Sequence, residues 1–236
     1  MKLFPFIFLF LAFYVIKAQE TNSDYLFEKD GYLICYKKSG EIFSGIMAGK
    51  SKDDNFTYKK TIVNGLEEGH AWFYENKNIL VSEGEYSQGI ENGKWIWYYS
   101  NGQIKAEGYY ENGVGSGMWK YWDESGHIER EGEIENGKEK GKWLYYNDFG
   151  NVSTTRIYQA GLKNGLEIWY YNDGQKMIER TFEYGIENGK FAGWFKNGQR
   201  KFEGSSVNGK IVRYIEWDLS GKAIKIQNNE LEDKNL

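Results

Sequence analysis

Glycine recurs every 24 residues along most of this chain, and that spacing constrains the fold more than any other feature of the sequence. Three sets of glycines keep the same step. The first is Gly45, Gly69, Gly93, Gly117, Gly141, Gly165 and Gly189; the second runs from Gly65 to Gly209, and the third from Gly102 to Gly198. Self-similarity at a fixed period is typical of a repeat array in which each unit contacts only its neighbours. The sequence therefore predicts one elongated body.

Within each unit, aromatic segments alternate with Asn-Gly pairs. After Gly93 comes an aromatic segment at 95–98, then Asn101-Gly102, then a second segment that ends at Asn112-Gly113. Asn-Gly supplies positive φ at both central positions of a type I′ turn, the tight turn of β-hairpins. A helical alternative fails because each glycine costs about 1 kcal/mol in a helix interior.

We therefore predict an all-β fold, an elongated single-layer antiparallel meander of β-hairpin repeats with a 24-residue period. Two strands per unit give about 13 or 14 strands. The glycines expected in turns are Gly93, Gly102, Gly113, Gly117, Gly137, Gly141, Gly165 and Gly189. Four others, Gly84, Gly108, Gly132 and Gly204, are expected to leave room for aromatic rings from neighbouring strands.

The two ends of the chain differ from the array. Residues 1–18 combine Lys2, an apolar run and Ala18, which is typical of a secretory signal peptide. A transmembrane anchor is the alternative, but the run falls short of the roughly 20 residues that cross a bilayer. We expect a disordered lead at 19–30, the array at 31–222 and a polar tail at 223–236. The protein is thus expected to be exported from a bacterial cell, to the periplasm, the outer envelope or the medium.

Composition and motifs disfavour several classes of function. Without residues 1–18 the chain has 28 basic residues, two fewer than the full count of 30, against 34 acidic ones. An acidic balance disfavours nucleic acid and anionic membrane surfaces as partners. His70 and His127 have neither a nucleophile nor a metal-ligand spacing around them, so we predict no enzyme, no metal site and no cofactor. The single cysteine, Cys35, is expected to be buried in a strand.

Two aromatic ladders repeat with the 24-residue period. The first, four residues after each leading glycine, is the candidate binding face and comprises Phe73, Trp97, Tyr121, Tyr145, Trp169 and Trp217. The second, one residue further on, comprises Tyr74, Tyr98, Trp122, Tyr146, Tyr170 and Trp194. Neighbouring residues of a strand point to opposite faces, so the two ladders are expected on opposite sides of the sheet. Rings are expected to stack along each ladder, and whichever ladder stays exposed marks a binding site.

Carboxylates share a third register. Glu83, Glu107, Glu131, Glu179 and Glu203 have one offset, and Thr155 interrupts them. One interpretation is a stripe for cations or a basic partner. The alternative, which we favour, is a solvated face balanced by Lys105, Arg130, Lys176 and Lys201.

The repeating pattern resembles a known family. Glycine, then tryptophan and paired aromatics, then an Asn-Gly turn and a strand ending in Glu-Gly resembles the MORN repeat, in the shorter bacterial variant of YwqK-type antitoxins. The best matches are GKWIWYYSNG at 93–102, GMWKYWDESG at 117–126 and GKWLYYNDFG at 141–150. The resemblance covers about residues 31–222 and implies a scaffold with an interaction surface. The antitoxin label implies binding to a toxin and its neutralisation.

Three functions follow as hypotheses. The first is an exported, non-catalytic repeat scaffold that binds a protein partner, or a second copy of itself, through an aromatic ladder. The second is a glycan-binding module of the cell envelope, in which aromatic rings stack on sugars while Glu and Asn bond their hydroxyls. The third is an antitoxin that neutralises a cognate toxin. Membrane lipid ranks last because the chain is acidic.

Overall fold

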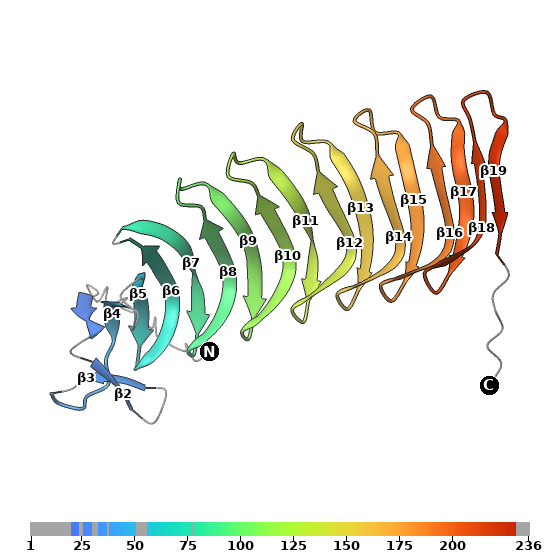
Figure 1. Ribbon diagram of the computed structural model, residues 1–236. Coiled ribbons are helices and arrows are strands. Elements are labelled where there is room, and N and C mark those ends of the chain that lie inside the picture. The colour runs from blue at the N-terminus through green and yellow to red at the C-terminus, as the bar shows by residue number, and fades with distance from the viewer. Residues whose placement is uncertain are drawn as a thin grey trace, which may run out of the picture.

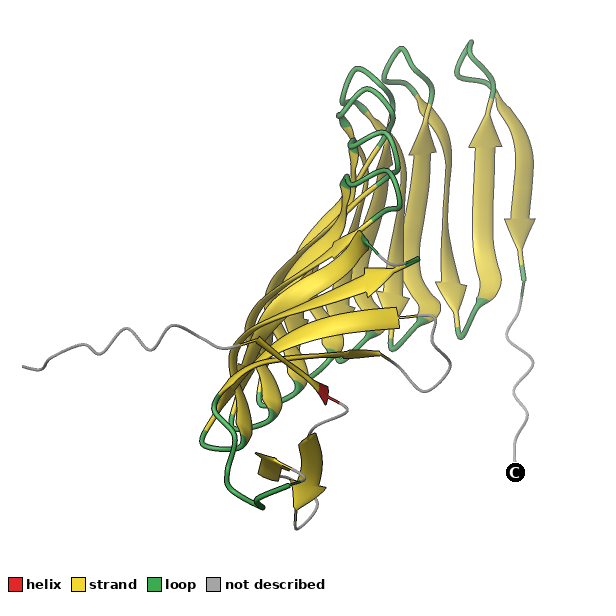
Figure 2. Ribbon diagram, turned by 90° about the vertical axis from the view of Figure 1, so that its left-hand side faces the viewer, coloured by secondary structure: helices red, strands yellow, loops and turns green. Residues whose placement is uncertain are grey.

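The computed structural model describes residues 20–23, 26–29, 33–36, 38–50, 56–76 and 78–229. They form one open sheet of 17 strands and a separate pair of strands. Strands β4 to β19 pair with their sequence neighbours, all antiparallel, and β1 adds to β4 in parallel. The sheet is a single layer that is long, twisted and curved (Figures 1 and 2). The predicted all-β meander is thereby confirmed.

The strand bounds are regular through the middle of the sheet. They are β1 (Glu20–Asn22), β4 (Gly45–Lys50), β5 (Phe56–Val63), β6 (Leu66–Glu75), β7 (Ile79–Ser87), β8 (Ile90–Tyr98), β9 (Ile104–Glu111), β10 (Val114–Trp122), β11 (Ile128–Glu135), β12 (Lys138–Tyr146), β13 (Val152–Gln159), β14 (Leu162–Tyr170), β15 (Lys176–Glu183), β16 (Ile186–Trp194), β17 (Arg200–Val207), β18 (Lys210–Trp217) and β19 (Ala223–Asn228). The separate pair is β2 (Leu26–Lys29) and β3 (Leu33–Tyr36).

The ends contain more strand than the sequence predicted, which is why the count exceeds 13 or 14. The segment 19–30 was expected to be disordered, but both β1 and β2 fall in it. The tail expected from residue 223 begins instead with β19, which extends the sheet through its pairing with β18. Apolar residues alternate with polar ones in Ala223–Asn228, which suits a strand when β18 is there to pair with it. The predicted signal peptide, residues 1–18, lies outside the described residues.

A small core closes the N-terminal end of the array. Leu26, Phe43, Met47 and Ile62 pack together, and all are buried. Ile34 donates its N–H to the carbonyl of Gly65, so the separate pair is held against the first tight turn. Cys35 has no exposed surface, as expected for a small residue in a strand.

Two kinds of turn alternate between the two long edges of the sheet. At one edge, Asn112 and Gly113 have φ of 51° and 77°, as a type I′ turn requires. The Gly113 N–H donates to the carbonyl of Glu91 in the preceding unit at 2.8 Å. At the other edge, the turn Tyr99–Gly102 has positive φ only at Gly102, which corrects the prediction of positive φ at both positions there. Successive hairpin turns are therefore tied to one another through their backbones.

The leading glycines were predicted to be turns, and this is wrong. Gly93, Gly117, Gly141, Gly165 and Gly189 lie inside strands β8, β10, β12, β14 and β16. Each has positive φ, for example 96° at Gly93, where the pairing of β7 with β8 shifts register. A glycine with positive φ in a strand is typical of a β-bulge, which bends the strand. Asn92-Gly93 is thus a bend in mid-strand.

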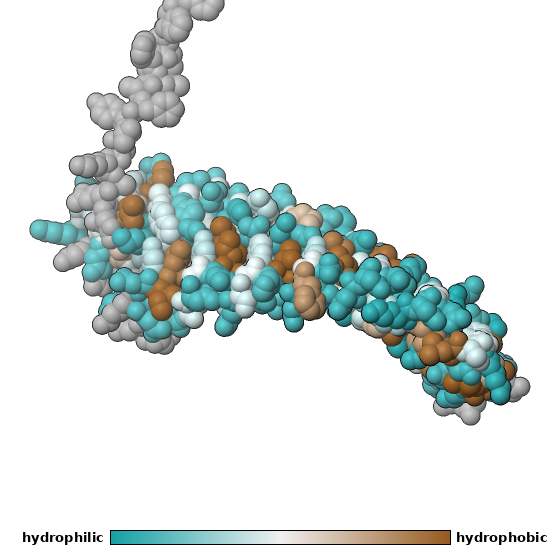
Figure 3. All heavy atoms as spheres, turned by 90° about the horizontal axis from the view of Figure 1, so that it is seen from above, coloured by the Kyte–Doolittle hydropathy of each residue, from teal (hydrophilic) through white to brown (hydrophobic). Residues whose placement is uncertain are grey.

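The sheet has two faces, which we name by their residues. The tryptophan face carries the rings of Trp95, Trp119 and Trp143. The carboxylate face carries Glu83, Glu107 and Glu131. Each of them directly precedes a glycine that pairs with a tryptophan, so its side chain points to the opposite side of the sheet. Viewed from above, hydrophobic side chains form short separate rows between hydrophilic ones (Figure 3).

Candidate functional site

A row of buried indoles forms the base of the tryptophan face. Trp95, Trp119 and Trp143 are 4%, 7% and 0% exposed, although the sheet has a single layer. Each ring lies over a glycine of the neighbouring strand. A β-carbon added to Gly84, Gly108 or Gly132 would lie within 2.6 Å of the facing indole. The predicted role of these glycines is confirmed, together with that of Gly204, which lies under Phe191.

The predicted binding ladder alternates with these buried rings. Phe73 stacks 5.9 Å from Trp95, and Trp97 lies 6.0 Å from Trp95 and 5.4 Å from Trp119. Tyr121 continues the stack at 6.2 Å from Trp119. The ladder residues of β6 to β14 are half-buried, and from Phe73 to Tyr121 they stack with the buried rings in one unbroken row. Sequence reasoning had left the buried row out, although residues two apart in a strand share a face.

Trp217 does not belong to this ladder, which corrects the prediction. In β8 the register shifts between Trp97 and Tyr98, whereas in β18 it shifts between Glu216 and Trp217. The last unit therefore reaches the shift one residue early, because it is one residue shorter near its bend. Trp217 pairs with Ala223 as Trp194 pairs with Arg200, and so takes the register of the second ladder.

Cations lie along the aromatic stack. The guanidinium of Arg130 lies 4.1 Å from the Tyr121 ring, and that of Arg156 lies 4.3 Å from the Tyr145 ring. Lys60 covers Phe73 at 5.5 Å, and Arg180 lies 5.8 Å from Trp169. Such contacts contribute about 0.5–1 kcal/mol at exposed sites. Three of these cations, Lys60, Arg156 and Arg180, lie at the offset where other units carry the glycine under the ring, and Arg130 lies two residues before that offset.

Each of these cations also has a carboxylate partner on the same face. Lys60 pairs with Glu67 at 2.7 Å, Arg130 with Glu139 at 3.5 Å and Arg180 with Glu187 at 2.8 Å. These three cations are 18%, 35% and 42% exposed at the side chain, which leaves the two arginines accessible to a partner. The tryptophan face is therefore aromatic at its centre and carries paired charges above it.

The tryptophan row is interrupted in β14. Glu167 stands where Trp143 stands one unit earlier, and its side chain is 2% exposed. Arg156 replaces the glycine opposite and donates its Nε–H to Glu167 at 2.5 Å, while Lys163 lies 3.4 Å away. The Arg180 Nε is buried, and among the described residues it has no hydrogen-bond partner. An ion pair thus replaces the indole-on-glycine contact.

The carboxylate face uses the second aromatic ladder differently. The Tyr98 hydroxyl donates to Glu83 at 2.5 Å, and the Tyr146 hydroxyl donates to Glu131 at 2.7 Å. The hydrogen bond from Tyr146 lowers the pKa of Glu131 against the opposing effect of burial, and Lys120 adds to the lowering. Burial, reinforced by the carboxylate, raises the pKa of both tyrosines to about 12. Two units of this face thus carry the same tyrosine–glutamate hydrogen bond.

The balancing cations differ from those expected. Lys176 does pair with Glu179, at 3.0 Å. Glu107 and Glu131 instead pair with Lys94 at 2.8 Å and Lys120 at 3.2 Å. The predicted partner Arg130 lies on the opposite face, because it is an odd number of residues away in the strand. The register as such was visible in the sequence, but the partners of Glu107 and Glu131 come from neighbouring strands.

The two histidines lie in separate settings. His70 Nε2 lies 3.0 Å from Glu83, and His127 Nδ1 lies 3.4 Å from Asp123. Within the described ranges, no group of three or more His, Cys, Asp or Glu side chains could hold a metal ion. A search of the same ranges for a helix both long and apolar enough to span a bilayer finds none.

Comparisons with known proteins identify the repeat. A family model described as "MORN repeat variant" matches residues 91–112, 116–136 and 163–184. The first two segments include Trp95 and Trp119, and the third includes Glu167, where the tryptophan row is interrupted. No curated protein matches the chain.

Two of the solved structures that match show little similarity to this chain. The Photorhabdus luminescens Tc holotoxin pore with the TccC3-D651A mutation is 10% identical, with a TM-score of 0.17, and the TcdB2-TccC3-Cdc42 structure is 9% identical, with a TM-score of 0.16. Each match covers 83% of this chain, which spans 14% of the matched chain. The family match at three repeats, on a meander of hairpins with one period, shows that this chain contains MORN repeats.

Proposed function

We propose that this MORN-repeat protein is a non-catalytic scaffold that binds a protein partner through its tryptophan face. The observation that carries the proposal is the continuous half-buried stack from Phe73 to Tyr121, with cations lying over it. Trp, Tyr and Arg dominate the residues that contribute most to protein interfaces. Rings already fixed by stacking lose little side-chain entropy when a partner covers them.

We further propose that binding takes place outside the cytoplasm, in the periplasm, at the outer envelope or in the medium. This rests on the predicted signal peptide, residues 1–18. The partner is then another exported protein or a second copy of this chain. A long face that extends over several repeats suits a partner that contacts several of them at once.

The test is crosslinking pull-down from the native cell envelope, with light scattering on the purified protein. Arg130→Ala removes a cation that covers Tyr121 on the tryptophan face. Lys120→Ala is a matched control on the other face, since Lys120 lies beside Tyr121 and is 40% exposed, compared with 35% for Arg130. Capture should fall at least several-fold with the first variant and stay unchanged with the second.

Two results would count against the proposal. One is a monomer that captures nothing specific. The other is capture that falls equally with both variants, because a partner on the tryptophan face cannot contact Lys120. The melting temperatures of the two variants are compared first, so that a loss of folding is not read as a loss of binding.

A further inference from the structure

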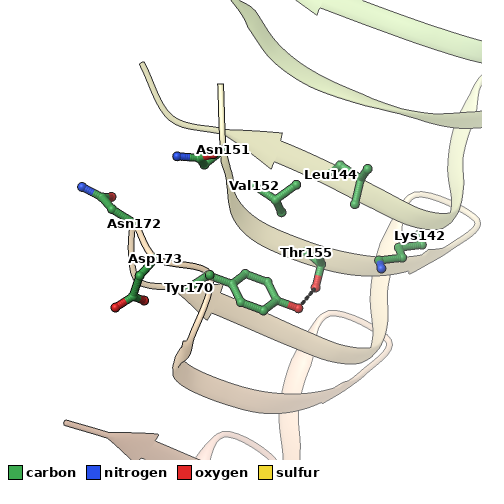
Figure 4. A pocket seen from close by; sticks show the side chains of 9 residues that line it. Lys142, Leu144, Asn151, Val152, Thr155, Tyr170, Asn172 and Asp173 are labelled. Carbon is green, nitrogen blue, oxygen red and sulfur yellow. Dashed lines mark hydrogen bonds between the residues drawn. The ribbon is translucent and has the colours of Figure 1, made fainter. Parts of the chain in front are cut away.

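A hollow of about 510 Å³ lies on the carboxylate face, between β12, β13 and β14. Leu144, Val152 and the ring of Tyr170 form its apolar wall, and Thr155 lies at its centre (Figure 4). This volume is within the range of small-molecule sites, about 300–1,000 Å³. The hollow lies away from the tryptophan face, so it is independent of the proposed protein interface.

The hollow exists because one repeat departs from the carboxylate register. Thr155 stands where the other units carry glutamate, and a threonine side chain is two heavy atoms shorter. Tyr146 donates to Glu131 at 2.7 Å, but the hydroxyl of Tyr170 lies 3.5 Å from the Thr155 hydroxyl. Tyr170 thus keeps most of its hydrogen-bonding capacity, and Thr155, only 5% exposed, turns its hydroxyl toward it (Figure 4).

The rim carries groups that can both donate and accept hydrogen bonds. Asn151 and Asn172 come from two adjacent loops, and Asp173 lies next to Asn172. Lys142 lies at the opposite end. Within the part of the chain that the structure describes, neither Lys142 nor the Asn151 amide is hydrogen-bonded through its side chain. The lining carries one positive and one negative group, so it has no excess charge.

This lining selects among classes of ligand. A ligand of either charge would meet one group of its own sign and one of the opposite sign, so the lining gives it no net electrostatic attraction. A purely apolar ligand would displace water from the amides and hydroxyls and offer no hydrogen bonds in its place, which costs free energy. A sugar ring presents an apolar C–H face to an aromatic ring and hydroxyls at its edges, which donate and accept as amides do. We infer that the hollow around Thr155 and Tyr170 is a binding site for a neutral saccharide.

The test is titration of the purified protein with cellobiose, lactose and N,N′-diacetylchitobiose, by saturation-transfer difference NMR and calorimetry. Glucuronic acid and glucosamine serve as charged probes. Thr155→Glu restores the register: the carboxylate should accept a hydrogen bond from Tyr170, as Glu131 does from Tyr146, and fill the hollow. The variant should keep the fold and weaken saccharide binding at least ten-fold. Asn172→Ala, at the exposed rim, should weaken it several-fold with no change in melting.

The control is Glu107→Thr, which makes the reverse exchange two repeats away and should leave saccharide affinity unchanged. The inference is overturned if none of the three disaccharides binds, or if only the charged sugars bind. It is also overturned if Thr155→Glu and Asn172→Ala both bind as tightly as the natural protein. Loss of saccharide binding leaves protein capture through the tryptophan face intact, so the two proposals fail separately.

Discussion

Replacing Gly132 with alanine tests whether the indole row holds the array together. Gly132 lies under the ring of Trp143, and an added β-carbon would lie 2.5 Å from Cγ of that ring. Carbon atoms are in comfortable contact at about 3.5–4.0 Å. The ring must therefore move by about 1 Å. It has little room to do so, because Trp143 has no exposed surface and packs 6.3 Å from both Tyr121 and Tyr158.

The expected cost follows from two opposing effects. Overpacking a well-packed core costs about 1–3 kcal/mol, and the size of this overlap points to the upper end. Alanine also restricts the unfolded chain, which returns about 0.4–1 kcal/mol. Gly132→Ala should therefore lower the free energy of unfolding by about 2 kcal/mol. For a chain of this length, that corresponds to a fall in melting temperature of about 4–8 °C.

A second glycine provides the control. Gly115 also lies outside the left-handed region, but its added β-carbon would meet Trp119 at 3.4 Å, an ordinary contact. Gly115→Ala should therefore be neutral or stabilising by up to about 1 kcal/mol. Urea unfolding is followed by near-ultraviolet circular dichroism, which reports the stacked indoles. Two results would refute the close packing of the Trp143 ring on Gly132. One is an equal free energy of unfolding for Gly132→Ala and the natural protein, and the other is an equal loss in Gly132→Ala and Gly115→Ala.

Three further predictions concern turns, buried charge and pH. Gly113→Val should lower the free energy of unfolding by about 1–3 kcal/mol in urea titration, because φ is 77° there and valine is strained at positive φ; an unchanged midpoint would exclude the type I′ turn. Glu167→Gln should cost about 3–5 kcal/mol in thermal unfolding, because it leaves Arg156 without its buried partner; a change under 1 kcal/mol would mean water reaches the pair. Glu131 has a lowered pKa in the folded state, so the stability that it adds is present above about pH 4.3 and is lost as the pH falls through its folded pKa. Glu131→Gln should flatten that acid loss, and it should also lower the pKa of Tyr146 from about 12, measured by tyrosinate absorbance; a natural slope and an unmoved Tyr146 would contradict the hydrogen bond.

The fold could be predicted because periodicity and turn chemistry agree. Asn112-Gly113 has one favourable hairpin geometry, and its recurrence every 24 residues fixes the meander. The same dipeptide misled at Asn92-Gly93, because a glycine with positive φ serves a bulge as well as a turn. The pairing between adjacent strands distinguishes a bulge from a turn. A single sequence does not show which residues of two strands face each other, so it could not make this distinction.

The candidate site was predicted in part for the same reason. The ladder through Trp97 and Tyr121 appears in the sequence as a period, and the structure places its members on one face. Trp217 was misplaced because a single residue missing from the last unit moves a side chain to the other face. Arg130 and Arg156 sit at different offsets, so their contacts with the rings come only from the pairing of strands.

The interruption at β14 explains why the glycines are spaced as they are. Gly108 and Gly132 flank Trp119 on its two neighbouring strands, and Trp143 has Gly132 on one side and Arg156 on the other. Where arginine takes both flanking positions, at 156 and 180, the indole is also gone and Glu167 replaces it. The indole and the glycine under it are therefore replaced together by an ion pair, which needs long side chains on both strands. This joint exchange indicates that the ring and the glycine beside it depend on each other, and it makes Glu167→Trp, with Arg156 and Arg180 kept, the substitution least able to restore the row.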